Sequence, residues 1–230
     1  MQEYGYRNEG NIDQCEVRGE LYTNDMDCAG ICCENDGKIT RCNVFAKLTN
    51  CVTSLKFEFG LFFQLPETGG IASFNSGLIS NCNVESNLSN EYNGQFHGTV
   101  GGLTSTNNGL IENSTFKGTV AGKCAGGIVG SNYTIIKSCS VQCTVKGTNA
   151  AEFANINIWG DEGYIILDEI KNKPQGVIDN CEFTGSVEAS NKGLAVVDNS
   201  FTLYENAPQV KNCKINGVDV IREPELIEED

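Results

Sequence analysis

The chain repeats one short pattern of apolar and polar positions. Each copy has a β-branched residue, a small residue three positions later, and apolar residues five and nine positions after the first. In the second copy these are Ile39, Cys42, Val44 and Leu48. Self-similarity of this kind predicts a solenoid, in which each unit buries its apolar face against its neighbours. The units begin at Ile12, Ile39, Ile79, Ile111, Ile136, Ile178 and Val210, and the last one ends early at Asp219.

Three short strands are expected in each unit. Period-two spacing, as in Cys15, Val17 and Leu21, directs one face of an extended strand toward the interior. A second strand is expected on an Asn-x-Gly-x-Ile segment and a third on a Gly-Gly-Ile-like segment. Asparagine often precedes the Cys slot and tolerates left-handed φ, so a turn is expected there.

The predicted fold is therefore all-β: a single parallel β-helix of about seven coils, with three short strands per coil and insertions at one corner. In this arrangement Ile111 and Val141 point inward, whereas Glu112 and Gln142 point outward. The repeat domain is expected over residues 1–221. Residues 222–230 form an acidic tail whose composition is unsuited to a packed core.

The motifs resemble a known class of repeats. The stretch AGGIVGSN at 125–132, followed by the slots of Ile136 and Cys139, is similar to the GLUG-type glycine-rich repeat of bacterial surface proteins. The resemblance covers nearly all of residues 4–217 and departs from the repeat at Thr134 and Pro208, where glycine is expected. It implies a right-handed β-helix that is a passive module with an adhesion or cell-envelope role, and it brings no catalytic residues.

The N-terminal unit has no visible cap. Tyr4 falls where Ile31 and Ile71 fall in later units, so the first coil is expected either to continue a longer protein or to be covered by a partner, which allows oligomerisation. The first residues lack the features of a signal peptide, and no stretch approaches the roughly 20 apolar residues of a membrane span. The expected location is the cell surface for a fragment and the cytoplasm if Met1 is the native start.

The twelve cysteines are predicted to be structural. Six share one slot of the repeat, and Ser114 fills it in the fourth unit, so disulfide pairing is not obligatory there. The Cys28-x3-Cys32-Cys33 cluster lacks the paired spacing of zinc modules, and neither a metal nor a cofactor is predicted. Reduced thiols favour a reducing compartment or an anaerobic setting. The slot is occupied by Cys15 and by five cysteines expected to be buried small hydrophobes, Cys42, Cys82, Cys139, Cys181 and Cys213.

The formal net charge is −14, from 30 acidic and 16 basic residues. No basic stripe occurs, so direct binding to nucleic acid is disfavoured and a protein or glycan partner is expected. An acidic rod can instead imitate a nucleic acid toward a protein that binds one. The alternative function is therefore an acidic cytosolic inhibitor that mimics nucleic acid or occupies a basic protein site.

Insertions lengthen three of the units, at Thr53–Pro66, Ser89–His97 and Ala150–Pro174. All three are assigned to the corner between the Cys-x-Val strand and the Gly-Gly-Ile strand. Insertions at one corner of a stacked repeat project from one side, often the binding side. The aromatic residues could instead pack their own loops onto the solenoid. The predicted partner surface comprises Phe57, Phe62, Phe63, Trp159, Asp161, Tyr164 and Asp168.

A polysaccharide lyase or hydrolase is the third hypothesis, since two carboxylates flanking a glycosidic bond can catalyse its cleavage. The single histidine, His97, lacks a recognisable serine or cysteine partner motif. Neither a P-loop nor a dinucleotide fingerprint occurs. The function expected first is thus a non-enzymatic β-solenoid module for binding or scaffolding. The acids considered for catalysis are Asp161, Glu162, Asp168, Glu169, Asp179 and Glu182.

Overall fold

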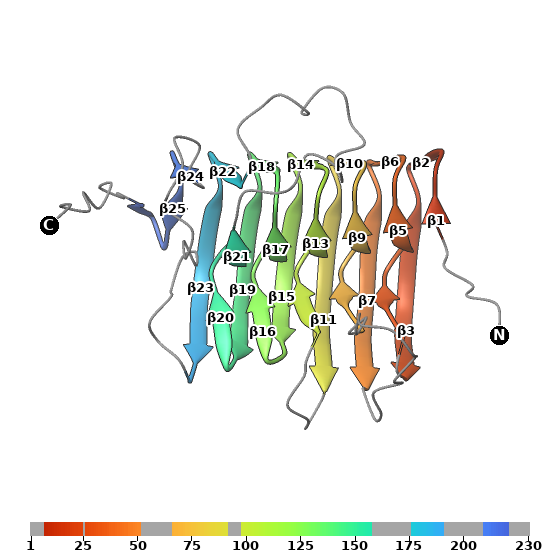
Figure 1. Ribbon diagram of the computed structural model, residues 1–230, viewed down its shortest axis with the longest axis horizontal. Coiled ribbons are helices and arrows are strands. Elements are labelled where there is room, and N and C mark those ends of the chain that lie inside the picture. Colours follow the sequence, from red (N-terminus) through yellow and green to blue (C-terminus); the bar gives the residue numbers. More distant parts are fainter. Residues whose placement is uncertain are drawn as a thin grey trace, which may run out of the picture.

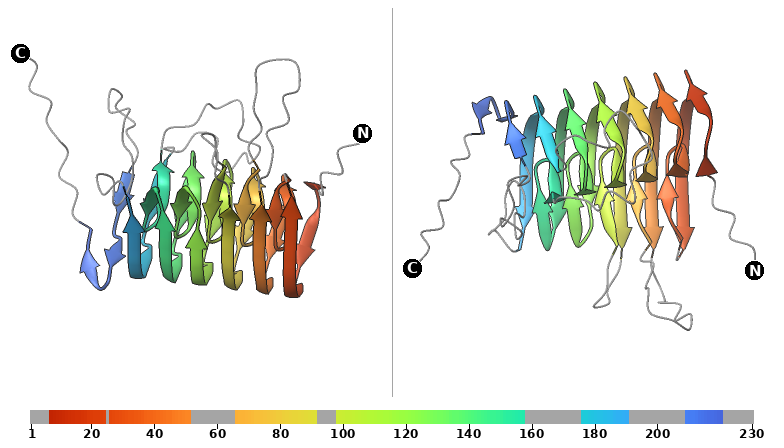
Figure 2. Two further views of the ribbon diagram at one scale, coloured as in Figure 1. Left: turned by 90° about the horizontal axis from the view of Figure 1, so that it is seen from below. Right: turned by 45° about the horizontal axis from the view of Figure 1, so that its top comes forward.

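The computed structural model describes residues 7–24, 26–51, 66–91, 98–157, 176–190 and 209–220. Within these ranges the chain forms β-strands and no helix, so no helix there could cross a membrane. The strands form four sheets, and neighbours in each sheet come from successive repeats (Figures 1 and 2). The pairings are parallel, except for one hairpin at the C-terminal end. The predicted all-β, parallel organisation is confirmed and is consistent with a β-solenoid.

Sheet C contains the long strands that follow the Cys slot. Val44 pairs in register with Val84, and Leu48 with Leu88, so equivalent side chains stack in rows inside the protein. Alternation along the strand places every second residue outward, as period-two spacing requires. The strands are β3 (Glu16–Asn24), β7 (Asn43–Cys51), β11 (Asn83–Glu91), β15 (Thr115–Ala121), β19 (Ser140–Gly147), β23 (Glu182–Ala189), β25 (Lys214–Ile215) and β26 (Val218–Asp219).

Sheet B contains the short strands built around the β-branched slot. Ile111 of sheet B is buried, and Glu112 lies on the outer face in an ion pair with Lys137 at 2.8 Å. In sheet C, Val141 is likewise buried and Gln142 is exposed. The predicted inward and outward positions are therefore confirmed. The strands are β2 (Asn11–Asp13), β6 (Lys38–Thr40), β10 (Leu78–Ser80), β14 (Leu110–Glu112), β18 (Ile135–Lys137), β22 (Val177–Asp179) and β24 (Gln209–Lys211).

The turn between sheets B and C uses a left-handed residue directly before the Cys slot, as predicted. Asparagine and other short polar residues tolerate this conformation best, because their side chains bond locally. The turn is nevertheless kept where the sequence has arginine or glutamine, so its geometry is imposed by the stacked neighbours. The φ values lie between 49° and 57° at Gln14, Arg41, Asn81, Asn113, Ser138, Asn180 and Asn212.

The Gly-Gly-Ile segment is not one strand, and the prediction of three strands per coil is wrong. The chain bends at this segment, which separates a strand of sheet D from a strand of sheet A. Sheet D contains β4 (Cys28–Ala29), β8 (Thr68–Gly69), β12 (Thr99–Gly101), β16 (Cys124–Gly126) and β20 (Asn149–Ala151). Sheet A contains β1 (Arg7–Asn8), β5 (Cys32–Asn35), β9 (Ala72–Asn75), β13 (Thr104–Asn107), β17 (Val129–Asn132) and β21 (Ala154–Asn157).

The glycine at this bend is required by close approach. A Cβ at Gly102 would lie 2.1 Å from the carbonyl oxygen of Gly127 and 2.7 Å from the Phe116 ring, which belongs to sheet C. The bend therefore presses against the inner face of sheet C, and a side chain at Gly102 would overlap the next repeat. Glu152 occupies the equivalent slot in the fifth repeat, beyond which no strand of sheets D and A follows within the described ranges.

The insertions do not share one corner, which corrects the prediction. Residues 52–65 and 92–97 do link sheet C to sheet D, between β7 and β8 and between β11 and β12. In the fifth repeat, however, residues 149–157 form the regular strands β20 and β21, and the extra residues 158–175 link sheet A to sheet B. Residues 150–157 were expected to belong to the insertion because Ala151-Glu152-Phe153 lacks the glycine pair that marks the bend in the second, third and fourth repeats.

Buried asparagine side chains form a hydrogen-bonded row at the last residues of the sheet A strands. The amide of Asn35 donates to the oxygen of Asn75 at 2.7 Å, Asn75 donates to Asn107 at 2.8 Å, and Asn107 donates to Asn132 at 2.9 Å. Asn8 begins the row with a bond to Asn35 at 2.8 Å. Each amide is satisfied by its own equivalent in the next repeat, so the row favours this register of the stack alone.

Breaking the asparagine row should be costly. Asn75→Ala leaves the amide of Asn35 and the oxygen of Asn107 without this partner in the interior, so we expect a loss of about 3 kcal/mol in the free energy of unfolding. Urea denaturation followed by circular dichroism measures it. The matched control is Asn87→Ala on the exposed outer face of β11, which should change stability by less than about 0.5 kcal/mol. Equal losses at the two sites would contradict the importance of the row.

Removing one buried hydroxyl should stabilise the protein. Thr104 is fully buried between Ala72 and Val129 in sheet A, and its Oγ1 has no hydrogen-bond partner among the described residues. Thr104→Val keeps the shape and removes the desolvated group, so thermal and urea unfolding should show a gain of about 1 kcal/mol. Thr106→Val, which removes a hydroxyl that does have a partner, should destabilise the protein instead. A destabilised Thr104→Val variant would refute this account.

Candidate functional site

The residues predicted to bind a partner lie outside the described ranges, and the topology divides them into two groups. Phe57, Phe62 and Phe63 fall in the link from β7 to β8, at the corner between sheets C and D. Trp159, Asp161, Tyr164 and Asp168 fall in the link from β21 to β22, at the corner between sheets A and B. The residues on either side of these links are described.

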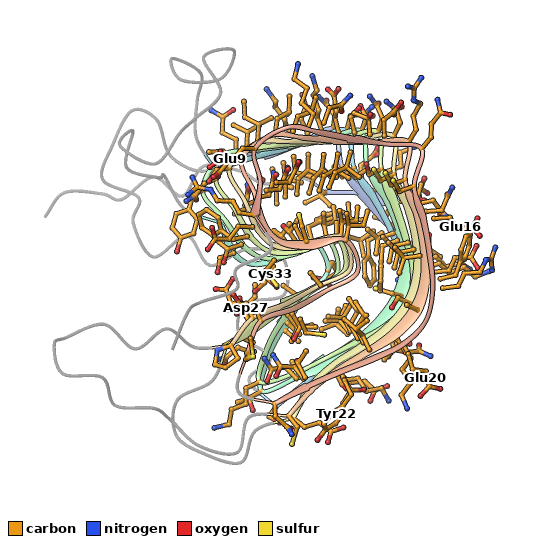
Figure 3. All side chains as sticks on the ribbon, turned by 90° about the vertical axis from the view of Figure 1, so that its right-hand side faces the viewer. Glu9, Glu16, Glu20, Tyr22, Asp27 and Cys33 are labelled. Atoms are coloured by element: carbon orange, nitrogen blue, oxygen red, sulfur yellow. The ribbon has the colours of Figure 1, made fainter. Side chains whose placement is uncertain are left out.

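Both corners lie on one side of the protein. Viewed along the stack, Glu9 marks the corner between sheets A and B, and Asp27 marks the corner between sheets C and D (Figure 3). Glu16 and Glu20 lie on the opposite side, where they point outward from β3 (Figure 3). The two insertion sites therefore flank the region where sheets D and A meet, here called the seam.

Asparagine side chains hold the corner between sheets C and D. The Asn50 amide donates to the carbonyl oxygen of Met26 at 2.8 Å, and the Asn90 amide donates to that of Pro66, also at 2.8 Å. Asn50 and Asn90 are neighbours in register at the ends of β7 and β11. The backbone on which the first insertion ends is thus fixed by hydrogen bonds from the repeat itself.

Two carboxylates begin sheet D at this corner. Asp27 and Glu67 each directly precede the first residue of a strand, Cys28 of β4 and Thr68 of β8, which are register partners. The Asp27 Oδ1 accepts a hydrogen bond from the backbone N–H of Glu67 at 2.8 Å. The Glu67 Oε1 accepts one from the Thr106 hydroxyl at 3.1 Å, across the seam from sheet A. No ion pair within the described ranges reaches either carboxylate.

The enclosure of these acids changes how they titrate. Burial, followed by the charge of Asp27, raises the pKa of Glu67 to about 8. Burial also raises the pKa of Asp27. The pKa of Tyr133, at the corner between sheets A and B, is raised by burial and then by the charge of Glu67. Glu67 therefore influences both corners, and near neutral pH it holds a proton that it can release.

Short polar side chains fill the rest of the seam. The hydroxyls of Thr99 in sheet D and Ser105 in sheet A bond to each other, and Ser105 also donates to the Thr99 carbonyl oxygen at 2.9 Å. Ser73 donates to the Cys28 carbonyl oxygen at 3.2 Å. These hydroxyls therefore bond within the seam, whereas the Oγ1 atoms of Thr68 in sheet D and Thr104 in sheet A have no hydrogen-bond partner among the described residues.

The slot cysteines form a hydrogen-bonded row. The backbone N–H of Cys181 donates to the Cys213 sulfur at 3.4 Å, and the N–H of Cys82 donates to the Ser114 hydroxyl at 3.1 Å. The side chain in turn donates to the carbonyl oxygen two residues earlier, as Ser114 does to Glu112 at 2.8 Å. A small side chain that both donates and accepts fits this role, which explains why serine can replace cysteine.

The predicted burial is confirmed for Cys42, Cys82, Cys139, Cys181 and Cys213. Cys15 is exposed, since no further repeat stacks on its outer side within the described ranges, and all twelve cysteines are free thiols. Burial raises the pKa of Cys32 to about 12 and that of Cys33 to about 11, so neither is a reactive thiolate at neutral pH. The described residues contain no group of three metal-ligating side chains.

The acids considered for catalysis do not form a described pair. Asp179 accepts a hydrogen bond from the Asn212 amide at 2.8 Å and lies 3.8 Å from the Lys211 ammonium, so it belongs to a surface network. Glu182 points outward from β23, as predicted, and is exposed. Asp161, Glu162, Asp168, Glu169 and His97 lie outside the described ranges.

In comparisons with known proteins, no family model, no curated protein and no solved structure matches the chain.

Sequence reasoning missed the pair formed by Asp27 and Glu67. They are 40 residues apart, on either side of an insertion, and nothing in their local motifs is shared. Their one common signal is position, because each directly precedes a sheet D strand. That signal becomes visible only once the Gly-Gly-Ile segment is divided into two strands.

Glu67 should make stability depend on pH. Folding raises its pKa from an ordinary 4.5 to about 8, so the folded state binds this proton more tightly than the unfolded chain. Its stabilising effect is complete below pH 4.5 and is lost as the pH rises through 8. Glu67→Gln stays neutral, so its melting temperature should match that of the wild type near pH 4.5 and exceed it at pH 8.5. Glu85→Gln, on the exposed face of β11, should follow the wild type throughout, and parallel curves for Glu67→Gln would disprove the shift.

Proposed function

We propose that this protein is a non-enzymatic β-solenoid module that binds or scaffolds a protein or glycan, of adhesion or cell-envelope type. Its fold would be a right-handed parallel β-helix of about seven coils. The resemblance of residues 125–139 to GLUG-type repeats supports both the handedness and the surface role. The partner surface would comprise the two insertion corners and the seam between them.

The proposal rests on one observation. The rows of asparagine and cysteine side chains bond within the repeat itself, whereas the long insertions begin and end at its corners. The asparagine and cysteine rows are bonded within the stack, as are the hydroxyls of Thr99 and Ser105 in the seam. The bonds from Asn50 to Met26 and from Asn90 to Pro66 fix the backbone beside the first two insertions. A rigid scaffold that carries variable links on one side is the usual arrangement of a binding module.

The aromatic side chains Phe57, Phe62, Phe63, Trp159 and Tyr164 supply apolar contact area to this surface. Tyrosine and tryptophan suit both glycan and protein partners, since their rings pack while their polar atoms bond. Glu67 contributes a carboxyl that becomes charged near its pKa of about 8. A partner with basic or hydrogen-bond-donating groups is favoured.

The net charge of −14 supports a second candidate, the acidic inhibitor of a protein that binds nucleic acid. Such binding would depend on long-range attraction and would weaken steeply with salt. Aromatic contacts at the corners would be far less sensitive to salt.

The test deletes residues 54–65 and measures retention on immobilised acidic and neutral polysaccharides. The deletion leaves Val52, Thr53, Pro66 and Glu67 to join β7 to β8, whereas two residues, 122–123, suffice between β15 and β16. We expect the far-ultraviolet spectrum to stay unchanged and retention to fall by at least roughly tenfold, as for loss of a central aromatic contact. Trp159→Ala should have a similar effect, and Phe45→Ala on the outer face of sheet C should have none.

Each alternative has its own outcome in this experiment. Retention that survives both changes would move the search to the flat faces of the sheets. Retention only on a cationic peptide, lost in high salt, would favour the acidic inhibitor. Release of sugar products that stops in Asp161→Asn or Asp168→Asn, with binding retained, would establish an enzyme.

A further inference from the structure

The N-terminal end of the stack exposes a long strand edge. β3 pairs with β7 over all nine of its residues and is the last strand of its sheet within the described ranges. Its inward residue Leu21 is 40% exposed, and Val17 is partly exposed, whereas their equivalents Leu48 and Val44 in β7 are fully buried. A long, half-apolar edge of this kind is a template for another strand.

The opposite end of the same sheet is closed by a hairpin. β26 turns back antiparallel onto β25, and the Asn216 side chain bonds both ways with the backbone of Gly185, at 2.9 and 3.1 Å. Val220 packs against the core beyond the hairpin. Because the short antiparallel strand β26 covers the C-terminal edge of this sheet, stacking of one copy's N-terminal end on another's C-terminal end is disfavoured. The exposed edge of β3 is better matched by a second β3.

We propose that two copies of this chain associate through β3, antiparallel, with Gly19 on the two-fold axis. A two-fold interface uses the same patch from each copy, so the patch must be complementary to itself. In this register Arg18 faces Glu20 of the second copy, and the symmetry repeats that pair. Val17 faces Leu21 of the second copy, so the exposed apolar side chains cover each other.

Charge selects this register over its neighbours. A shift by a single position would put inward residues opposite outward ones, so the nearest registers that keep the faces together are centred on Arg18 or Glu20. Centring on Arg18 sets the two arginines against each other and Glu16 against Glu20. Centring on Glu20 sets the two glutamates against each other. Only the register centred on Gly19 replaces these repulsions with two opposite-charge pairs.

The surroundings of the axis fit the same arrangement. A Cβ built on Gly19 meets nothing within 4 Å, so the centre of the edge is open to a close neighbour. Glu16, Glu20 and Tyr22 point outward from β3 and leave its edge uncovered (Figure 3). Ile12 precedes β3 and Met26 follows it. The two-fold axis therefore brings Ile12 of each copy toward Met26 of the other. Met26 is 59% exposed in the single chain.

The test measures the oligomeric state of the whole chain by sedimentation equilibrium over a concentration series. The wild type should be in reversible monomer–dimer equilibrium. Arg18→Glu and Glu20→Arg each create two like-charge pairs and should raise the dimer Kd roughly a hundredfold. The double variant, with both changes, restores the opposite-charge pairs and should dimerise like the wild type. Lys117→Glu, on the outer face of the central strand β15, is the charge-reversal control and should leave Kd unchanged.

Mixing the two single variants gives the sharpest result. One carries acids at both positions 18 and 20 and the other carries arginines at both, so they should form a heterodimer although neither dimerises well alone. A wild type that stays monomeric would overturn the proposal, as would a dimer whose Kd ignores these changes or a mixture that fails to associate. A monomer that dimerises only after removal of residues 1–6 would also overturn it, by assigning the edge to the chain's own first residues.

Discussion

The constraint on which the rest of the structure depends is the parallel, in-register pairing of each strand with its equivalent in the next repeat. Where the same polar residue recurs at one position, it can enter the interior at low cost if its side chain bonds to its copy in the next repeat. Asparagine meets this condition because its amide both donates and accepts, and the row from Asn8 to Asn132 follows directly. The thiol and hydroxyl of the Cys slot meet it through the backbone. The same pairing makes glycine necessary at the bend between sheets D and A, where the carbonyl of the next repeat occupies the place of a side chain.

The pairing of like with like is relaxed at the start of sheet D. At the start of sheet D the equivalent positions hold Asp27 and then Glu67, and burial together with the charge of Asp27 opposes the ionisation of Glu67. A repeat selected only for stability would avoid such a pair. Its place beside the first insertion, with Thr106 and Tyr133 across the seam, links it to the surface proposed for binding.

At the ends of the stack, a strand lacks an equivalent strand on one side. Within the described ranges an internal repeat has two neighbours and the first has one, so identical slot residues are buried at Val44 and partly exposed at Val17. The C-terminal end resolves this with a reversed strand and the side chain of Asn216. At the N-terminal end the residues around Gly19 instead form an edge whose charges complement each other under two-fold rotation. Stacking within one copy and association between copies thus draw on the same backbone pairing.

The sequence by itself determined the repeat, its inward and outward positions, the left-handed turn before the Cys slot and the burial of the slot cysteines, because each depends on local period and on residue size. Only the tertiary structure decided that the Gly-Gly-Ile segment bends into two strands, since the bend is set by contact with Phe116 and its equivalents in sheet C. Because this segment forms two strands, residues 158–175 connect sheet A to sheet B, and Asp27 and Glu67 lie together at the start of sheet D. These are contacts between residues far apart in the chain, and no local pattern encodes them. The aromatic and acidic residues of the insertions follow no repeat at all, so the period that predicted the fold carries no information about what they bind.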